Sequence, residues 1–272
     1  EEYVQQVLAE HKGERVYHFT YNDKDFWLKQ PEQLHGVWHF LKPKPKQAFK
    51  NEIQSLQYLA EHQAPVPHLE MFGEDFLVLE DGGNSVAHWM GLHLSEQQKR
   101  VILLDAAVAL AALHQQGLVH GRPAIRDILW RDGQVLFIDF EVNATKRALS
   151  KQKARDLLMF IYNLCREDEL SDEIICDVMR KYRECCEPQE WLDMLASVEH
   201  YRCIYYLLLP FKSIAKRDLI GIYRLYQNIE QVKKEDLNKL NFSKFISYFS
   251  WVYLLSFGGM GRNAMLDTHF IR

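Results

Sequence analysis

Two short stretches of the sequence concentrate the side chains that could do chemistry. The first runs from His120 to Trp130 and reads His-Gly-Arg-Pro-Ala-Ile-Arg-Asp-Ile-Leu-Trp, and the second is Ile138-Asp139-Phe140-Glu141. Asp139 ends an apolar strand pattern, where a carboxylate is seldom a plain surface residue. We therefore expect Asp139 to have a charge-handling role, such as binding a metal ion.

The segment before residue 80 is rich in strand patterns that could position such a site. Asn22-Asp23 has turn chemistry and lies between two β-rich runs, which predicts a hairpin. One helix is expected between this hairpin and two further strands, because apolar residues recur there at helical spacing. The predicted elements are strands at Val16–Tyr21 and Asp25–Lys29, a basic proline-broken loop at 42–46, a helix at Gln47–His62, and strands at His68–Phe72 and Phe76–Leu79.

From Leu94 onward the pattern becomes helical. Ser95 and Gln98 form a capping-box pair that opens a long apolar helix through His114, and Gly117 ends it. Asp132-Gly133 predicts a second hairpin, between Ile128–Trp130 and Val135–Ile138. Residues 151–257 are helical in pattern almost throughout. The sequence thus predicts an α+β protein with a strand-rich first part and a helical remainder.

The order of these motifs resembles the protein-kinase-like superfamily, in which a loop H-x-D-x-x-x-x-N is followed by a hairpin and by D-F-G. The resemblance covers residues 4–165. It implies a two-lobed α+β fold, with a small β-rich N-lobe at 1–80 and a larger, mainly helical C-lobe at 81–272. The catalytic loop and the second hairpin would belong to the C-lobe.

The resemblance also implies roles for individual residues. His120 takes the position of the loop histidine, and Asp139 that of the aspartate that holds Mg²⁺ against the nucleotide phosphates. Asp127 takes the position of the metal-binding asparagine. Lys29 is similar to the lysine that contacts the α- and β-phosphates of ATP, and Glu52 to its ion-pair partner. Taken alone, Lys29 would be a solvated strand lysine and Glu52 a surface carboxylate.

Two further residues are assigned in the same way. Glu80 lies in Leu77–Asp81, which resembles the hinge that carries the adenine of the nucleotide. Asp156 resembles the helix aspartate that braces the catalytic loop. His120 is expected to be structural, since it would pack and hydrogen-bond the loop whether or not the site is active.

The sequence departs from the kinase pattern where the chemistry is most specific. Arg122 stands where kinases place the aspartate that accepts the proton of the substrate hydroxyl. Asp127 replaces asparagine, Glu141 replaces the last glycine of D-F-G, and the nucleotide loop has the single glycine Gly13. Arg122 could neutralise charge on the transferred phosphoryl group, or it could pair with Asp127 or Glu141 and hold the loop shut.

Two functions therefore stay open. Within the superfamily the string H-G-R-P-x-x-R-D-I-x-W is most similar to small bacterial lipopolysaccharide core (heptose and Kdo) kinases and to Bud32-like kinases. This resemblance implies an ATP- and Mg²⁺-dependent transfer to a hydroxyl of a sugar or glycoconjugate, with Asp127 as metal ligand and base. The alternative is a pseudokinase that binds nucleotide or a partner without transferring phosphate.

Composition limits the other classes. The chain has 272 residues, and its 33 basic and 37 acidic side chains give a net charge of −4, which does not favour a nucleic-acid binder. The histidine spacings indicate no zinc site. Five cysteines without a C-x-x-C pair are typical of free thiols in a reducing cytoplasm. We expect a cytoplasmic protein.

Charge is unevenly distributed along the chain. Residues 211–272 hold ten Lys or Arg and five Asp or Glu, a net +5, so the first 210 residues carry −9. The basic C-terminal region could contact anionic lipid, which would make the protein peripheral at the inner membrane. The alternative, which we favour at this stage, is a solvated face of a helical lobe.

Overall fold

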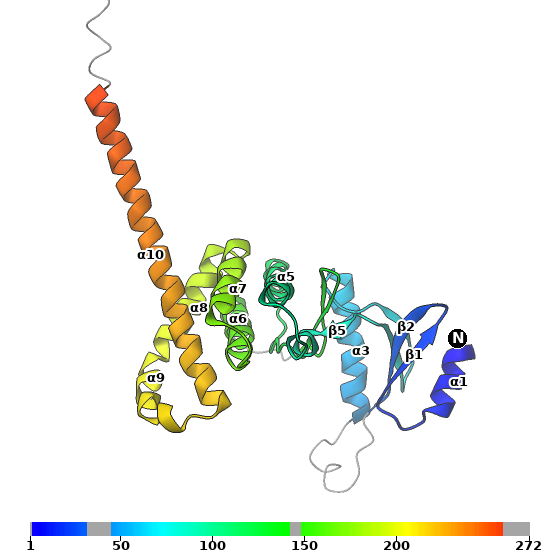
Figure 1. Ribbon diagram of the computed structural model, residues 1–272. Helices are drawn as coiled ribbons and strands as arrows, with labels where there is room; N and C mark the ends of the chain where they lie inside the picture. The colour runs from blue at the N-terminus through cyan, green and yellow to red at the C-terminus, as the bar shows by residue number, and fades with distance from the viewer. Residues whose placement is uncertain (1, 32–44, 142–147, 258–272) are drawn as a thin grey trace, which may run out of the picture. The chain divides into compact units, whose positions relative to one another are not determined.

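The computed structural model describes residues 2–31, 45–141 and 148–257, and it has an α+β architecture. A small antiparallel sheet with two helices forms its N-terminal part, and the remainder is mainly helical (Figure 1). The N-terminal elements are α1 (Glu2–Glu10), β1 (Val16–Tyr21), β2 (Lys24–Lys29), α3 (Pro45–Glu61), β3 (Leu69–Phe72) and β4 (Leu77–Glu80).

The four strands form one antiparallel sheet in the order β1-β2-β4-β3. The predicted first hairpin is confirmed: β1 and β2 pair from Val16↔Lys29 to Tyr21↔Lys24. Asn22 and Asp23 turn it with φ of 51° and 60°, a left-handed conformation that these two residue types tolerate. Most of the predicted loop at 42–46 lies outside the described residues, and Pro45 begins α3.

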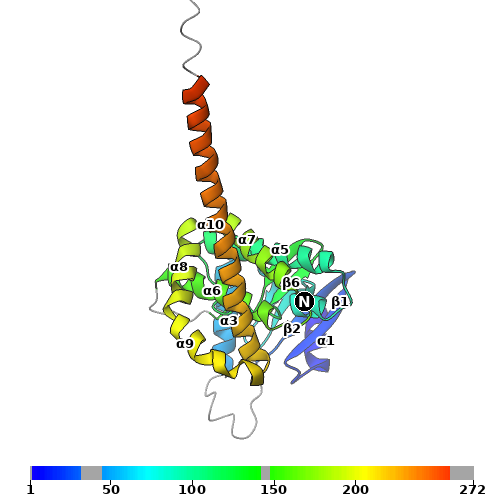
Figure 2. The ribbon, with the colours of Figure 1, turned by 60° about the vertical axis from the view of Figure 1, so that its left-hand side comes forward.

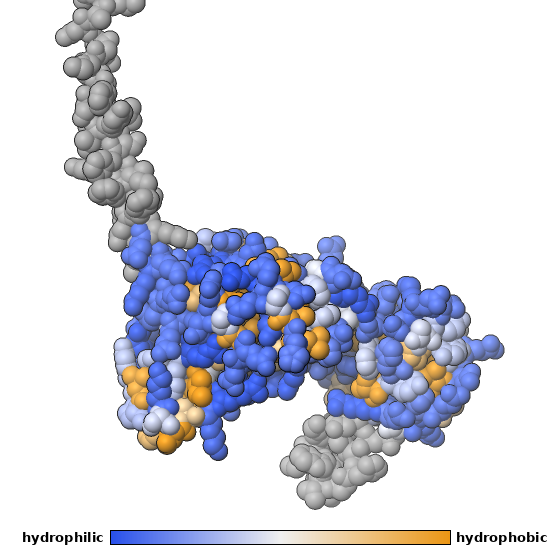
Figure 3. Space-filling model, viewed as in Figure 1, coloured by the Kyte–Doolittle hydropathy of each residue, from blue (hydrophilic) through white to orange (hydrophobic). Residues whose placement is uncertain are grey.

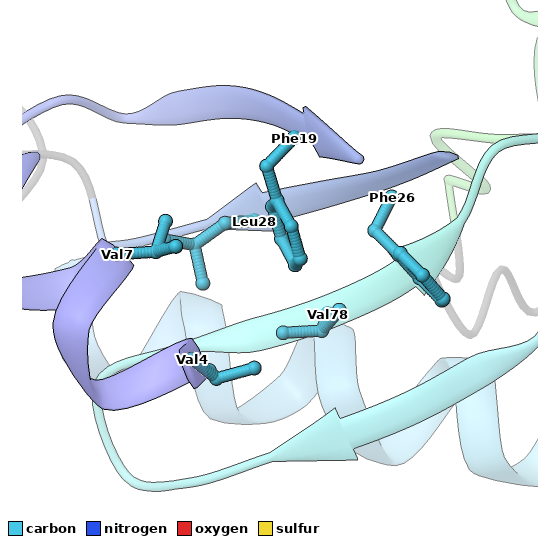
Figure 4. Packing of buried hydrophobic residues seen from close by; sticks show 6 residues of the cluster. All are labelled: Val4, Val7, Phe19, Phe26, Leu28 and Val78. Atoms are coloured by element: carbon cyan, nitrogen blue, oxygen red, sulfur yellow. The ribbon is translucent and has the colours of Figure 1, made fainter. Parts of the chain in front are cut away.

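Alternation along β4 gives the sheet two covered faces. Val78 points to the side of α1, where it packs with Val4 and Val7 (Figure 4). Leu77 and Leu79 point to the opposite side, where they pack against α3. Neighbouring residues of a strand face opposite ways, so one buried strand serves both helices. The strand-rich pattern of the first eighty residues did not predict α1, which is a helix at Glu2–Glu10.

Register places Lys29 on the face of the sheet that α3 covers. Lys29 pairs with Leu77 in the β2–β4 ladder, and directly opposed residues of an antiparallel pair share a face. The preceding pair, Leu28 with Val78, belongs to the α1 face. The last residue of β2 is therefore directed toward α3.

The second part begins with a three-stranded sheet of order β5-β6-β7 beside α5. The predicted capping box is confirmed, since the Ser95 side chain accepts from the Gln98 backbone and the Gln98 side chain from the Ser95 backbone. The second hairpin is confirmed as well, with Asp132 and Gly133 at φ of 48° and 86°. The elements are β5 (Asn84–Ser85), α4 (Val86–Met90), α5 (Glu96–Gln115), β6 (Ile128–Arg131) and β7 (Gln134–Phe137).

Helices make up the rest, as the pattern predicted. In both views α5 lies beside α7, and α6 packs on α8 (Figures 1 and 2). Buried cysteines Cys165, Cys176 and Cys186 contribute to these helices, and all five cysteines are free thiols. The elements are α6 (Leu149–Cys165), α7 (Asp172–Cys185), α8 (Pro188–His200), α9 (Arg202–Leu208), the 3₁₀ helix η1 (Leu209–Ile214) and α10 (Arg217–Phe257).

A buried polar chain crosses this helical part. The Tyr182 hydroxyl lies 2.5 Å from His114 Nδ1 and 3.5 Å from Glu190 Oε2, and Glu190 forms an ion pair with Lys153. On its other side His114 Nε2 lies 3.5 Å from Asp156 Oδ2. This buried polar chain, a row of contacting polar side chains, links α8, α7, α5 and α6 through residues that are almost fully buried.

Contacts divide the chain into two compact units, residues 1–226 and 227–272. The predicted change at residue 80 is thus a change of secondary structure inside the first unit, which contains every residue of the predicted site. Within the described part of the chain, none of the helices combines the length and apolar character needed to cross a bilayer.

Candidate functional site

Lys29 joins two carboxylates that lie far from it in the sequence. Its Nζ atom is 3.2 Å from Glu52 Oε1 and 3.6 Å from Asp139 Oδ1. The lysine ends β2, the glutamate lies on α3, and the aspartate follows β7. The Lys29 side chain is 22% exposed, so it is partly shielded from water. The structure thus brings together three of the predicted site residues.

A cavity of about 410 Å³ adjoins this ion-pair cluster. Lys29, Glu52 and Asp139 line it, together with the apolar side chains of Leu79 and Phe140. Its size is within the range of small-molecule sites, which combine apolar walls with a few placed polar groups. Arg15 also lines the cavity, and no motif in the sequence pointed to it.

Asp139 has a left-handed backbone, with φ of +57°. Residues on either side fix this conformation: Ile138 N donates to Asp127 O at 2.9 Å, and Glu141 N donates to His120 O at 2.8 Å. Non-glycine residues in this region cost free energy and are concentrated at functional sites. The loop at 120–127 therefore determines where the Asp139 carboxylate points.

Asp156 holds the start of that loop through its backbone. Its Oδ2 accepts from His120 N at 2.6 Å, and its Oδ1 accepts from Gly121 N at 3.0 Å. Asp156 is only 1% exposed, and hydrogen bonds from amides to a buried carboxylate are strong. This side chain is well placed to brace the loop.

The His120 ring is a packing element of the site. Its Nε2 lies 2.9 Å from Ile138 O, and Arg122 N donates to its Nδ1 at 3.4 Å. Both bonds are satisfied by the neutral tautomer with the proton on Nε2. The ring stacks on Phe140 at 4.6 Å between centroids. Burial lowers the pKa of His120, and the nearby carboxylates raise it by less. The pKa is therefore lowered on balance, so the neutral ring is favoured.

Asp127 is the most buried carboxyl group among the metal-ligand candidates, at 5% exposure. Burial raises the pKa of Asp127 and the neighbouring charge of Asp139 raises it further, while Arg126 and Arg122 lower it. Arg126 Nε lies 3.4 Å from Asp127 Oδ1. The carboxylates of Asp127 and Asp139 therefore interact electrostatically.

Arg122 faces Glu141 across the site. The Arg122 Nε lies 3.1 Å from Glu141 Oε1, and both side chains are partly exposed. The sequence left Asp127 and Glu141 open as partners of Arg122 in a loop-closing pair. In the structure Arg122 pairs with Glu141. Gly121 allows the two segments to approach, because a Cβ atom there would lie 2.7 Å from Glu141 O. Arg155 also donates to Gly121 O.

Glu80 lies apart from the ion-pair cluster. Its Oε1 is 3.3 Å from Lys24 Nζ, and its backbone N donates to His68 O at 2.9 Å. The adjacent Asp81 accepts from Trp27 and pairs with Arg131. The Glu80 and Asp81 side chains are therefore engaged within the protein, and Leu79 is the residue of the 77–81 segment that lines the cavity.

Divalent-cation chemistry would rest on two carboxylates. Among the described residues, no three His, Cys, Asp or Glu side chains gather in a way that could hold a metal ion. Asp127 and Asp139 alone would leave most of the coordination sphere of Mg²⁺ open. Mg²⁺ is commonly bound through one or two carboxylates together with substrate phosphates, and this pair of aspartates fits that arrangement.

Comparison with known proteins gives a relative but no described family. No family model matches the chain. An uncharacterized protein of Haemophilus influenzae is 48% identical over 236 residues, which cover 86% of this chain and 97% of that protein. The chain belongs to the same family as this Haemophilus protein.

Proposed function

We propose that this protein is an ATP- and Mg²⁺-dependent phosphotransferase of the protein-kinase-like superfamily. The observation that carries the proposal is the position of Lys29 Nζ, 3.2 Å from Glu52 and 3.6 Å from Asp139 beside a cavity. Phosphoryl transfer in protein kinases requires an ion pair between a strand lysine and a helix glutamate, together with an aspartate that holds Mg²⁺. In this proposal residues 1–80 act as the N-lobe and the helical remainder as the C-lobe.

The chain's own residues would divide the work as follows. Lys29 offers a compact positive charge to the α- and β-phosphates of ATP, and Glu52 orients it. The segment 77–81, which includes Glu80, would act as the hinge that receives the adenine, with Leu79 lining the cavity. Asp127 and Asp139 would hold Mg²⁺, which when bound neutralises charge on the phosphates. The transition state is loose, so positioning and electrostatics supply most of the rate.

Asp127 is the group that can take the proton. The acceptor hydroxyl oxygen forms a bond to the γ-phosphorus while the bond from that phosphorus to the leaving ADP oxygen breaks, and the hydroxyl proton passes to Asp127. An aspartate carboxylate can accept such a proton as a general base. Arg122 lies in the same loop and can stabilise negative charge on the transferred group.

The acceptor class follows from the resemblance described above, which is closest to lipopolysaccharide core kinases. We propose a hydroxyl of a sugar or glycoconjugate as acceptor and the cytoplasm as the place of reaction. No nucleic-acid partner is proposed.

One observation favours a second candidate, a pseudokinase. Arg122 occupies the position of the usual proton acceptor and is engaged by Glu141 at 3.1 Å. A loop closed in this way would allow nucleotide or partner binding without transfer. General-base help contributes about 10²–10⁴-fold, so its loss alone does not abolish phosphoryl transfer.

Thermal unfolding with Mg²⁺ and ATP, followed by a nucleotide-turnover assay, tests both candidates. Ligand at about 100 times its dissociation constant should stabilise the fold by about 2.7 kcal/mol. Lys29→Met should lose this stabilisation, whereas Lys46→Met, which removes an exposed lysine paired with Asp75, should keep it. Stabilisation without turnover favours the pseudokinase, and no stabilisation of the wild type contradicts both the phosphotransferase and a nucleotide-binding pseudokinase.

A further inference from the structure

A solvent-facing apolar stripe runs along α9 and η1. Leu207 and Ile214 are 71% and 73% exposed, and Ile204 and Phe211 are about half exposed. These four residues follow one another at spacings of three, four and three, so they lie along one side of the two short helices. Figure 3 shows hydrophobic residues gathered at the end of the molecule where Figure 1 labels α9. Apolar patches of this kind mark interaction surfaces.

The opposite side of the same segment is anchored to the first unit. The Tyr205 ring stacks on Tyr226 at 4.3 Å with an interplanar angle of 19°. Tyr223 donates its hydroxyl to Leu208 O, and Tyr226 donates to Val198 O at 3.2 Å. The inward face of α9 is therefore already packed and hydrogen-bonded within the protein. These contacts hold the segment in place and leave the apolar stripe on its outward face.

The charge of the segment has one sign. Residues 201–217 contain Arg202, Lys212, Lys216 and Arg217 and no aspartate or glutamate, which gives +4 within 17 residues. Arg202 pairs with Glu199 and Arg217 with Glu167, so these two are partly neutralised. Lys212 and Lys216 are both exposed and flank Ile214, the most exposed apolar side chain of the stripe.

We propose that residues 201–217, which we call the α9–η1 surface, bind an anionic lipid bilayer in the plane of its headgroups. Aliphatic and aromatic side chains beside lysines are the composition of interfacial helices, with apolar groups entering the acyl boundary and lysines meeting anionic headgroups. A second copy is disfavoured as occupant, because a symmetric contact would bring the exposed Lys212 and Lys216 of one copy close to the same lysines of the other.

This inference goes beyond the proposed transfer reaction and does not depend on it. The sequence suggested a membrane contact through residues 211–272. The proposed surface lies instead at residues 201–217, so it includes the apolar residues of α9. Of that region, residues 258–272 lie outside the described structure.

Vesicle flotation of the purified full chain tests the proposal. Phosphatidylcholine vesicles with added phosphatidylglycerol should carry the protein, and vesicles of phosphatidylcholine alone should carry much less. Each lysine near an anionic surface contributes about fivefold in partition, so Lys212→Ser with Lys216→Ser should weaken binding by about 25-fold. Leu207→Ser and Ile214→Ser should each cost about tenfold, because each removes an inserted apolar group.

Tyr58→Ser is the matched control, since Tyr58 is half exposed on α3, outside the surface. This variant should float like the wild type, and thermal unfolding should show that every variant is folded. The proposal is overturned if the wild type does not bind anionic vesicles. It is also overturned if the double lysine variant and Leu207→Ser bind these vesicles as well as the wild type does. It is also overturned if Leu207→Ser instead converts a dimer to a monomer in light scattering, because the occupant is then a second copy.

Discussion

Arg122 and Glu141 form an ion pair at 3.1 Å between the loop after α5 and the segment after β7. Each residue replaces one that the kinase pattern would place there, an aspartate and a glycine respectively. The two replacing side chains form an ion pair with each other, so the two differences from the kinase pattern, at residues 122 and 141, are structurally linked.

The first prediction concerns the role of Arg122 in the proposed reaction. If its guanidinium stabilises charge on the transferred group, Arg122→Gln should lower kcat by about 10²-fold, as loss of one such donor does in other enzymes. Stability should change by less than about 1 kcal/mol, because the pair with Glu141 is partly exposed and screened by water. Steady-state kinetics and denaturant unfolding measure the two effects. Transfer that rises in Arg122→Asp would instead support the pseudokinase.

A second prediction concerns the metal role of Asp139. Asp139→Asn keeps a residue that tolerates the left-handed φ of +57° but removes the carboxylate charge, so Mg²⁺-dependent nucleotide binding should fall at least about tenfold. Asp132→Asn is the matched control, since Asp132 has a φ of +48° in the exposed β6–β7 turn. Titration calorimetry with Mg²⁺ and ATP compares them. Equal binding by both variants would remove Asp139 from the proposed metal site.

Gly121 should be intolerant of a side chain. Its φ of +95° is left-handed, and a Cβ atom would lie 2.7 Å from the Glu141 carbonyl oxygen. Gly121→Ala should destabilise the fold by about 1–3 kcal/mol. Gly117→Ala shares the left-handed strain, with φ of +76°, but its Cβ would meet nothing within 4 Å. The difference between the two variants in urea unfolding isolates the steric contact, and equal losses would show that only backbone strain matters.

Tyr182 should be essential to the buried polar chain. Tyr182→Phe removes the hydroxyl between His114 and Glu190 and leaves polar groups without that partner, at a cost of about 1–3 kcal/mol. Tyr162→Phe, which removes an exposed hydrogen bond to Asp218 O, should cost much less. Chemical denaturation compares the two, and similar losses would argue against a special role for the buried chain.

Stability should fall in acid through His120. An unfolded imidazole takes up a proton near pH 6.5, whereas burial holds the pKa of folded His120 below that value. The unfolded state therefore binds more protons as pH falls below 6.5, and the contribution of the neutral buried ring, complete above that pH, is progressively lost. His120→Gln should flatten the stability profile between about pH 5 and pH 8. His88→Gln, which replaces an exposed histidine, is the matched control.

Much of this architecture was predictable from local signals. Ser95 with Gln98, Asn22-Asp23 and Asp132-Gly133 mark their helix and turns because capping and left-handed turns depend on few neighbouring residues. The approach of Lys29, Glu52 and Asp139 could be anticipated only through the kinase resemblance, since their meeting depends on tertiary packing.

Other features lacked a usable local signal. Helix α1 is an exception, because Val4, Val7 and Leu8 recur at the i, i+3, i+4 spacing of a helix, a signal that the strand-rich pattern of the following residues obscured. Glu141 could be considered as a partner of Arg122, but choosing it over Asp127 required the loop geometry around Gly121. The exposure of Leu207 is likewise a tertiary property, because an apolar helix normally suggests a core.

The carboxylate of Asp156 joins the site loop to the helical core, since it accepts from His120 N and Gly121 N and lies beside His114. These two amides are held by a buried carboxylate, so we expect them to exchange with solvent deuterium more slowly than exposed loop amides. The start of the loop should therefore be better protected from exchange than the exposed turns of the first unit. A site on so rigid a support relies on preorganisation, and the substrate must adapt to it.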